Sequence, residues 1–293
     1  MNGRAADRPG LQRLLIETIT GQRPIERSGP LLRAFRGMPA PGRDLVRWLL
    51  RPKRRFLYGR LRAAAGDRVM SGPFAGMRLT GYPAAPELLG TYECELFPVV
   101  RELAERRPRS LVNIGARFGY YAIGLARLIP ELHVVAFEAE AEARAVLAGA
   151  VAANGVADRV QVGGFCDGPA LEAALGSGDG VLVVCDIEGG EVPLLDPTAV
   201  PALRHATILV ECHGPPESPT EPVMTTRFLP THAVRSVAIE PRSLAQLPEG
   251  VAEPWRARMP RTLVALMEEH RTLPQSWVLL TPRASAAPRP LAG

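Results

Sequence analysis

Residues 110–129, SLVNIGARFGYYAIGLARLI, decide the fold of this chain. The first six residues form an apolar run of strand length, and the last eleven repeat apolar positions with helical spacing. Gly115 and Gly119 indicate a turn between the strand and the helix, since glycine commonly interrupts regular secondary structure. The stretch therefore predicts a β-strand that turns directly into an α-helix.

The same order of strand and helix is repeated downstream. Apolar segments of strand length lie within residues 133–140, 159–165, 180–191 and 206–214, and residues 141–155 predict a helix closed by Asn-Gly. Continuous Val/Ile/Leu strands separated by helices are typical of a parallel sheet that is covered on both faces.

The C-terminal part continues this pattern more loosely. Residues 227–240 and 274–282 predict a sixth and a seventh strand, and residues 261–270 predict a helix between them. We therefore predict an α/β fold, a doubly wound, seven-stranded and mostly parallel sheet, within a domain at residues 69–281. Residues 282–293 lack apolar periodicity and predict a disordered tail.

The segment before the domain is basic. Residues 1–68 contain 16 Lys+Arg against 5 Asp+Glu, whereas residues 69–293 contain 19 against 25, so the net charge of +5 averages two unlike parts. We predict a helical N-terminal extension that caps the domain, with an amphipathic helix at residues 44–66 that is interrupted at Pro52. Residues 69–81 predict a hairpin, and residues 86–108 predict a helix that leads into the domain.

Composition excludes several classes of protein. The chain has 293 residues, 46% of them hydrophobic, which suits a globular enzyme and not a disordered protein. It contains no apolar run of the roughly 18 to 20 residues that a membrane span needs, and no signal peptide pattern, so we expect a cytoplasmic protein. Cys94, Cys166, Cys185 and Cys212 have no CxxC spacing and are expected to be reduced core thiols.

The first two strand ends suggest nucleoside binding. In open parallel sheets, ligands bind beyond the carboxyl ends of the strands. The Gly115 turn opens a helix whose free N–H groups can face a ligand, although a simple strand-to-helix turn has the same pattern. Glu138 ends the second strand, where an acid can accept both hydroxyls of a ribose. The GxxxG spacing lacks the GxGxxG of dinucleotide binders and disfavours a pyrophosphate, and hence a dehydrogenase.

The fourth and fifth strand ends carry candidate bases. Asp186 and Glu188 follow the fourth strand, where carboxylates can bind an ammonium group or accept a proton. Alternatively, they are solvated acids at a helix N-terminus, which the helix dipole favours. His213 follows the fifth strand and is either a general base or a structural histidine. His232 is a more distant candidate base. Asp186, Glu211 and His213 together could hold a divalent metal, but their spacing is not a ligand signature, and we predict no metal.

With these motifs in order, residues 72–280 resemble a class I S-adenosylmethionine-dependent methyltransferase, and more closely the FkbM-like group. The resemblance lies in VNIGARFGYYAIGLA, AFEAE, CDIEGGEVPLL and ILVECH, and upstream in GPFAGMRL and LLGTYECELFP. It implies S-adenosylmethionine as the cofactor and the following contact residues: Tyr92, Glu93, Asn113, Gly115, Ala116, Gly119, Glu138, Ala139, Phe165, Cys166 and Asp186. Glu138 would hold the ribose, Phe165 or Cys166 would approach the adenine, and Asp186 would lie near the methionine moiety or the reacting centre.

Two departures from the family pattern stand in the glycine loop. Asn113 occupies a place where an acid is common, and Arg117-Phe118 replaces a small or polar pair. Asn113 can still orient the loop by hydrogen bonding, and we expect Arg117 to point outward, because a cation beside a sulfonium would weaken binding.

The leading functional hypothesis is O-methylation of a small hydroxylated metabolite, with Asp186, Glu188 or His213 as the base. A second hypothesis is an RNA-directed methyltransferase, because Trp48, Phe56 and Tyr58 alternate with arginines in the basic extension. A third is a catalytically silent protein that uses the cofactor fold to bind a partner. The sequence identifies neither the methyl acceptor nor the oligomeric state.

Overall fold

The computed structural model describes residues 52–214, 219–269 and 275–283. The predictions for residues 1–51 and 284–293 lie outside these ranges. The strands are β1 (Ser110–Ile114), β2 (His133–Phe137), β3 (Val160–Gly163), β4 (Val181–Cys185), β5 (Thr207–Cys212), β6 (His232–Ala238) and β7 (Ser276–Pro282).

Helices precede the sheet, alternate with its strands and follow β6. The α-helices are α4 (Pro52–Ala65), α5 (Ala85–Leu89), α6 (Phe97–Glu105), α7 (Tyr120–Leu128), α8 (Ala141–Ala153), α9 (Gly168–Leu175), α10 (Glu191–Leu194), α11 (Thr220–Phe228), α12 (Trp255–Arg258) and α13 (Pro260–Met267). The 3-10 helices are η2 (Cys94–Leu96), η3 (Pro201–Arg204) and η4 (Leu244–Gln246).

The sheet confirms the predicted fold class. Its strands have the order β3-β2-β1-β4-β5-β7-β6, and only β7 runs antiparallel to its neighbours. The chain moves outward from β1 through β2 to β3, and then returns to place β4 on the other side of β1. This reversal leaves a crevice at the carboxyl ends of β1 and β4, where ligands bind in sheets of this type.

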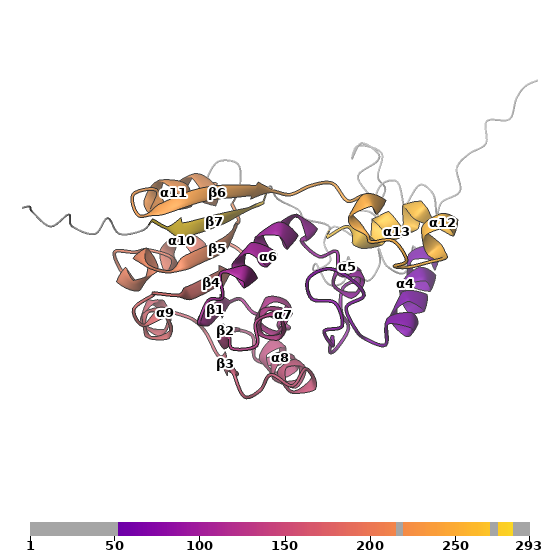
Figure 1. Cartoon of the computed structure of the whole chain (residues 1–293), viewed down its shortest axis with the longest axis horizontal. Helices are drawn as coiled ribbons and strands as arrows, with labels where there is room; N and C mark the ends of the chain where they lie inside the picture. The colour runs from indigo at the N-terminus through magenta and orange to yellow at the C-terminus, as the bar shows by residue number, and fades with distance from the viewer. Residues whose placement is uncertain (1–51, 215–218, 270–274, 284–293) are drawn as a thin grey trace, which may run out of the picture.

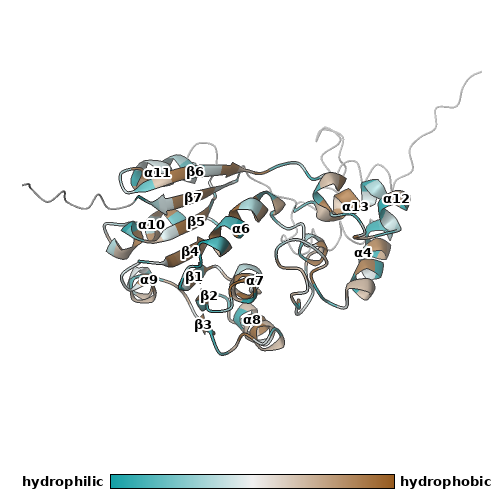
Figure 2. Cartoon of the chain, viewed as in Figure 1, coloured by the Kyte–Doolittle hydropathy of each residue, from teal (hydrophilic) through white to brown (hydrophobic). Residues whose placement is uncertain are grey.

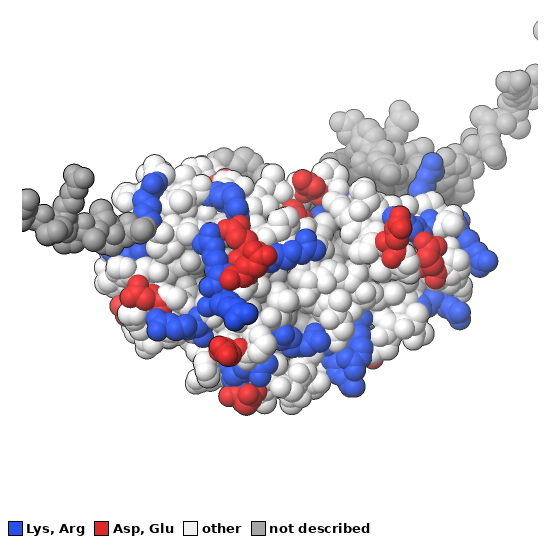
Figure 3. All heavy atoms as spheres, viewed as in Figure 1, with Lys and Arg blue, Asp and Glu red and all other residues white. Residues whose placement is uncertain are grey.

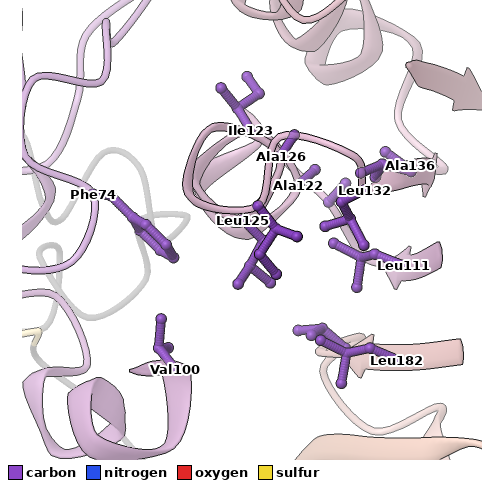
Figure 4. Packing of buried hydrophobic residues seen from close by; sticks show 14 of the residues in the cluster. Phe74, Val100, Leu111, Ala122, Ile123, Leu125, Ala126, Leu132, Ala136 and Leu182 are labelled. Carbon is purple, nitrogen blue, oxygen red and sulfur yellow. The ribbon is translucent and has the colours of Figure 1, made fainter. Parts of the chain in front are cut away.

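Each face of the sheet has its own hydrophobic core, because successive strand residues point to opposite faces. In β4, Leu182 and Val184 pack on the face covered by α6, α7 and α8, whereas Val183 and Cys185 pack on the face covered by α9 and α11. Figure 4 shows the first of these cores, in which Leu111 and Leu182 lie under the side chains of α7. Hydrophobic residues predominate along the central strand β4 in Figure 2, and all of its residues are buried. The four cysteines are free and buried, as predicted.

A third hydrophobic cluster lies outside the sheet. It joins Leu57 and Leu61 of α4 to Leu88 of α5 and Leu263 of α13, and we call this group of helices the helical lobe. Tyr58 is buried in the same cluster and donates a hydrogen bond to the Pro83 carbonyl (2.7 Å). Figure 1 shows the helical lobe beyond the end of the sheet toward which β6 points. Because β6 runs parallel to β5, this is the end that holds the crevice.

Two upstream predictions differ from the structure. Residues 67–79 fold back on themselves as the hairpin prediction requires, with backbone hydrogen bonds from Val69 to Met77 (2.9 Å) and from Leu79 to Asp67 (2.8 Å). The pairing is limited to one isolated antiparallel β-bridge between Arg68 and Arg78, without regular strands. The helix predicted at residues 86–108 is broken into α5, η2 and α6. The break begins at Gly90, which adopts a left-handed conformation (φ 75°), and a Cβ there would lie 2.0 Å from the Ser71 carbonyl oxygen. Helical periodicity continues past this glycine, but contact with Ser71 ends the helix.

None of the helices in the described ranges has both the length and the apolar character needed to cross a membrane.

Candidate functional site

A cleft of about 980 Å³ opens at the carboxyl ends of β1 to β5 and is completed by the segment between α5 and η2. Ten of the eleven residues predicted to contact a cofactor line it: Tyr92, Glu93, Asn113, Gly115, Ala116, Glu138, Ala139, Phe165, Cys166 and Asp186. The sequence motifs, which are spread over almost 100 residues, therefore meet in one cavity.

The glycine turn brings β1 and β4 close together. Gly115 has φ 76°, and a Cβ at this position would lie 1.8 Å from the carbonyl oxygen of Asp186. Gly119 is the eleventh predicted residue and does not line the cleft; it precedes α7, where a Cβ would meet Ile123 and Leu147 at 2.6 Å. Glycine is thus required at position 119 by packing against α7 and α8, and at position 115 by the close approach of the ends of β1 and β4.

Glu138 connects the end of β2 to the glycine turn. Its Oε2 accepts a hydrogen bond from the Arg117 backbone N–H (2.7 Å), and its Oε1 accepts one from the Glu140 N–H (2.8 Å). A carboxylate has about four acceptor positions, so each oxygen can still accept from a ligand hydroxyl. Arg117 is exposed at the rim, with its guanidinium carbon 5.0 Å from the centroid of the Phe118 ring.

The family resemblance predicts that the adenine contacts the residues at the end of the third strand, Phe165 and Cys166. Phe165 follows β3 and is 76% exposed at the edge of the cleft, while the neighbouring Cys166 is buried. Burial raises the pKa of the Cys166 thiol to about 12, so the thiol is neutral at physiological pH. An exposed phenyl ring beside a neutral thiol forms an apolar wall.

Buried polar residues form the side of the cleft opposite the sheet. Tyr121 donates a hydrogen bond to Glu93, whose backbone N–H donates to Glu269 Oε1 (2.9 Å). Arg242 joins Glu269 (2.5 Å) to Glu95 (2.6 Å) in ion pairs. Sequence reasoning missed Glu269 and Arg242, because they lie more than 140 residues after Glu93 and Glu95 in segments without a motif.

The ends of β4 and β5 bring the candidate bases together. His213 Nδ1 lies 2.8 Å from Glu191 Oε1, while its Nε2 lies 3.7 Å from Asp186 Oδ1, 3.5 Å from Glu188 Oε2 and 3.4 Å from Glu211 Oε2. Asp186, Glu188 and Glu211 line the cleft, and His213 lies buried behind them.

These contacts shift the pKa values of the cluster. Burial alone would lower the pKa of His213, but the neighbouring carboxylates of Glu191 and Glu211 raise it to about 10. Burial and the nearby charge of Glu211 raise the pKa of Asp186 to about 8, in spite of the opposing effect of His213. In this arrangement His213 is therefore protonated at neutral pH.

His232 takes no part in this site. It begins β6 and lies at the opposite end of the sheet from the cleft, because β6 runs parallel to β5. Its Nε2 lies 3.0 Å from the Ala206 carbonyl oxygen and its Nδ1 lies 2.8 Å from the Thr231 hydroxyl. The prediction of His232 as a distant candidate base is wrong, since its side chain is fully buried among structural partners.

Comparison with known proteins gives only remote similarities. No protein-family model and no curated protein matches the chain. Among solved structures, it is similar to a putative O-methyltransferase from Klebsiella pneumoniae (15% identity, 78% of this chain and 90% of that chain, TM-score 0.43). It is also similar to an O-methyltransferase from Bacillus cereus in complex with SAH (11% identity, 79% of this chain and 91% of that chain, TM-score 0.43). A third similar structure is a putative RNA methyltransferase from Pyrococcus horikoshii (12% identity, 78% of this chain and 98% of that chain, TM-score 0.43). With identities and TM-scores this low, the functional argument rests on the residues of the chain itself.

Proposed function

We propose that this chain is an S-adenosylmethionine-dependent methyltransferase of the FkbM-like group that O-methylates a small hydroxylated metabolite, such as a sugar or a secondary metabolite. The observation that carries the proposal is the convergence of ten predicted cofactor residues on one cleft. A volume of about 980 Å³ suits a nucleoside-sized cofactor together with a small acceptor.

The charge of the cleft supports a cationic cofactor. Nine carboxylate side chains line it, with Arg117 as the single basic residue among the described lining residues. S-adenosylmethionine carries positive charges on its sulfonium and its amino group, which an acidic cleft attracts. Glu138 would accept hydrogen bonds from the ribose, Phe165 and Cys166 would contact the adenine, and Asp186 would face the methionine.

When bound, S-adenosylmethionine supplies an electrophilic methyl group on sulfur. The protein has to hold the acceptor oxygen in line with the methyl carbon, exclude water and remove the hydroxyl proton. A C–O bond then forms as the S–CH₃ bond breaks, and the leaving group is a neutral thioether. Asp186 and Glu188 are proposed to accept the proton, because both line the cleft after the end of β4, whereas His213 lies behind them and is already protonated.

Calorimetric titration with S-adenosylmethionine and with its demethylated product tests the proposal. We expect Glu138→Gln to weaken binding about tenfold to a hundredfold, since hydrogen bonds to a charged group contribute about 1.5–3 kcal/mol. Glu142→Gln removes an exposed carboxylate from α8 outside the cleft and should leave the affinity unchanged. Absence of binding at millimolar cofactor would refute the proposal, and unchanged affinity in Glu138→Gln would remove that residue from the site.

The RNA-directed alternative has one supporting observation. Helix α4 contains five basic residues and no acid, and Figure 3 shows basic side chains at the end of the molecule where α4 lies. Two features oppose it: Tyr58 is buried instead of available for stacking, and the acidic cleft repels phosphates. Trp48 lies outside the described residues. Salt-sensitive retention on RNA would favour this alternative, and cofactor binding without turnover would favour the silent binding protein.

A further inference from the structure

The side chains at the ends of β4 and β5 are spaced like the ligands of a metal ion. One ligand atom each of Asp186, Glu211 and His213 lies within 4.8 Å of the other two. The distances from His213 Nε2 are 3.4 Å to Glu211 Oε2 and 3.7 Å to Asp186 Oδ1. Ligands about 2.1 Å from a shared ion are separated by about 3.0 Å at a right angle and about 3.4 Å in a tetrahedron. Small side-chain rotations would therefore complete the geometry.

Two atoms of this cluster are buried without a hydrogen-bond partner. The His213 side chain is 5% exposed, and its Nε2 forms no hydrogen bond with any residue in the ranges 52–214, 219–269 and 275–283. Within the same ranges, the Oδ1 atom of Asp186 is also buried and without a hydrogen bond, while the Asp186 side chain as a whole is 29% exposed. Leaving a buried polar atom unsatisfied costs about 1–3 kcal/mol. Two such atoms facing each other across 3.7 Å indicate that a ligand belongs between them.

Glu191 orients the imidazole toward that point. Its side chain is fully buried, and its Oε1 accepts the hydrogen bond from His213 Nδ1 at 2.8 Å. The same Oε1 also accepts a hydrogen bond from the Gly189 backbone N–H (3.1 Å), so this oxygen is the acceptor and His213 Nδ1 is the donor. Histidines that bind metals usually donate their second ring nitrogen to a carboxylate in this way. The remaining nitrogen, Nε2, consequently faces Asp186 and Glu211, where a bound cation would take the place of its proton.

We propose that Asp186, Glu211 and His213 bind a divalent cation of the Mn²⁺ class at the floor of the cleft. Two carboxylates supply the oxygen ligands that Mg²⁺ and Mn²⁺ prefer, while the imidazole favours a first-row transition metal over Mg²⁺. Asp186 and Glu211 line the cleft, so the open coordination positions face its interior. The exposed Glu188 carboxylate, 3.5 Å from Nε2, stands beside the same opening.

The catalytic role of this cation rests on the proposed methyl transfer, whereas its binding does not. An ion at this position would bind the acceptor oxygen and lower the pKa of its hydroxyl group, so that the Glu188 carboxylate would take the proton and the oxygen would attack as an anion. This proposal replaces the expectation of no metal, which was based on the sequence spacing of Asp186, Glu211 and His213. That spacing is not a ligand signature, but the folded chain brings one ligand atom of each residue within 4.8 Å of the other two and bonds Glu191 to His213.

Titration of the full chain with Mn²⁺ alone tests the site without any methyl donor. The protein is stripped with a chelator, and free Mn²⁺ is measured by its paramagnetic resonance signal. We expect one Mn²⁺ per chain, and at least about tenfold weaker binding in Asp186→Asn and in Glu191→Gln, the latter because outer ligands contribute this much. Glu142→Gln is the matched control and should bind as tightly as the wild type. Unchanged binding in both cluster variants would overturn the proposal.

A second measurement needs no variant and so does not depend on how a variant folds. Electron spin echo modulation of Mn²⁺ bound to the wild-type chain should show coupling to an imidazole nitrogen, because His213 Nε2 is a proposed ligand. Lack of that coupling, or no bound ion at millimolar Mn²⁺, would refute the site. If the cation binds and S-adenosylmethionine does not, the proposed function fails while the metal site stands.

Discussion

Gly115 illustrates how a single residue links the fold to the cleft. Its backbone N–H and that of Ala116 both donate to the Phe137 carbonyl (3.0 and 2.9 Å), which holds the turn against the end of β2. The same turn touches the Asp186 carbonyl, so the ends of three strands meet around one residue without a side chain. Glycine is required there for both its φ and its lack of a Cβ.

We predict that Gly115→Ala destabilises the protein by about 2–4 kcal/mol, because the new methyl group clashes with the backbone and the positive φ is strained. Gly149→Ala is the matched control: it lies within α8, its added methyl group would have no neighbour within 4 Å, and it should stabilise by about 0.5–1 kcal/mol. Urea unfolding measures both changes. Equal stability of the two variants would show that the close approach of β1 and β4 is not maintained.

At the scale of elements, the break between α5 and α6 builds the side of the cleft that faces the sheet. A continuous helix from residue 86 onward would remove the turn that places Tyr92 and Glu93 in the cleft. The broken segment is tied to the C-terminal part of the chain by Arg242, which pairs with Glu95 of η2 and with Glu269 after α13. These ion pairs are almost fully buried and join three segments distant in sequence.

Arg242→Met is expected to destabilise the protein by about 3–5 kcal/mol, because it leaves two buried carboxylates without their cation. Arg235→Met provides the same substitution at an exposed pair with Glu102, and we expect a loss of about 1 kcal/mol or less. Denaturant unfolding compares the two. A loss for Arg242→Met no larger than that for Arg235→Met would contradict a structural role for the buried pairs.

At the scale of the molecule, the helical lobe and the sheet form the two sides of one cleft. The described part of the basic extension, α4, packs into the lobe and not away from the protein. Its buried face presents Leu57, Tyr58 and Leu61 to α5 and α13, while its basic residues remain toward solvent or the lobe surface. This part of the extension thus contributes to the body that covers the cleft.

Leu61→Ala should destabilise the protein by about 2–5 kcal/mol, as expected for truncation of a fully buried leucine. Leu128→Ala, at the half-exposed end of α7, is the control and should change stability by about 1 kcal/mol or less. Thermal and urea unfolding of the full chain measure these effects. If Leu61→Ala behaved like the control, α4 would not belong to the folded body.

The sequence by itself determined the mostly parallel sheet, the succession of its strands along the chain and the strand ends that carry the cleft. Val/Ile/Leu runs, helical spacing and glycine turns are local signals, and parallel strands necessarily bring their carboxyl ends to one edge. The local signals alone therefore assign Gly115, Glu138 and Asp186 to a common cleft, although these residues are as many as 71 positions apart.

Only the tertiary structure decided which groups surround those ends. The break at Gly90 depends on contact with Ser71, and the pairing of Arg242 with Glu95 depends on a fold-back of almost 150 residues. The direction of His213 Nε2 toward Asp186 and Glu211 depends on the placement of Glu191. Contacts of this kind cannot be predicted from the periodicity of the sequence, because they form between segments that are distant in the chain. The sequence already names Asp186, Glu211 and His213 as possible metal ligands, but only the tertiary structure shows their ligand atoms within 4.8 Å of one another.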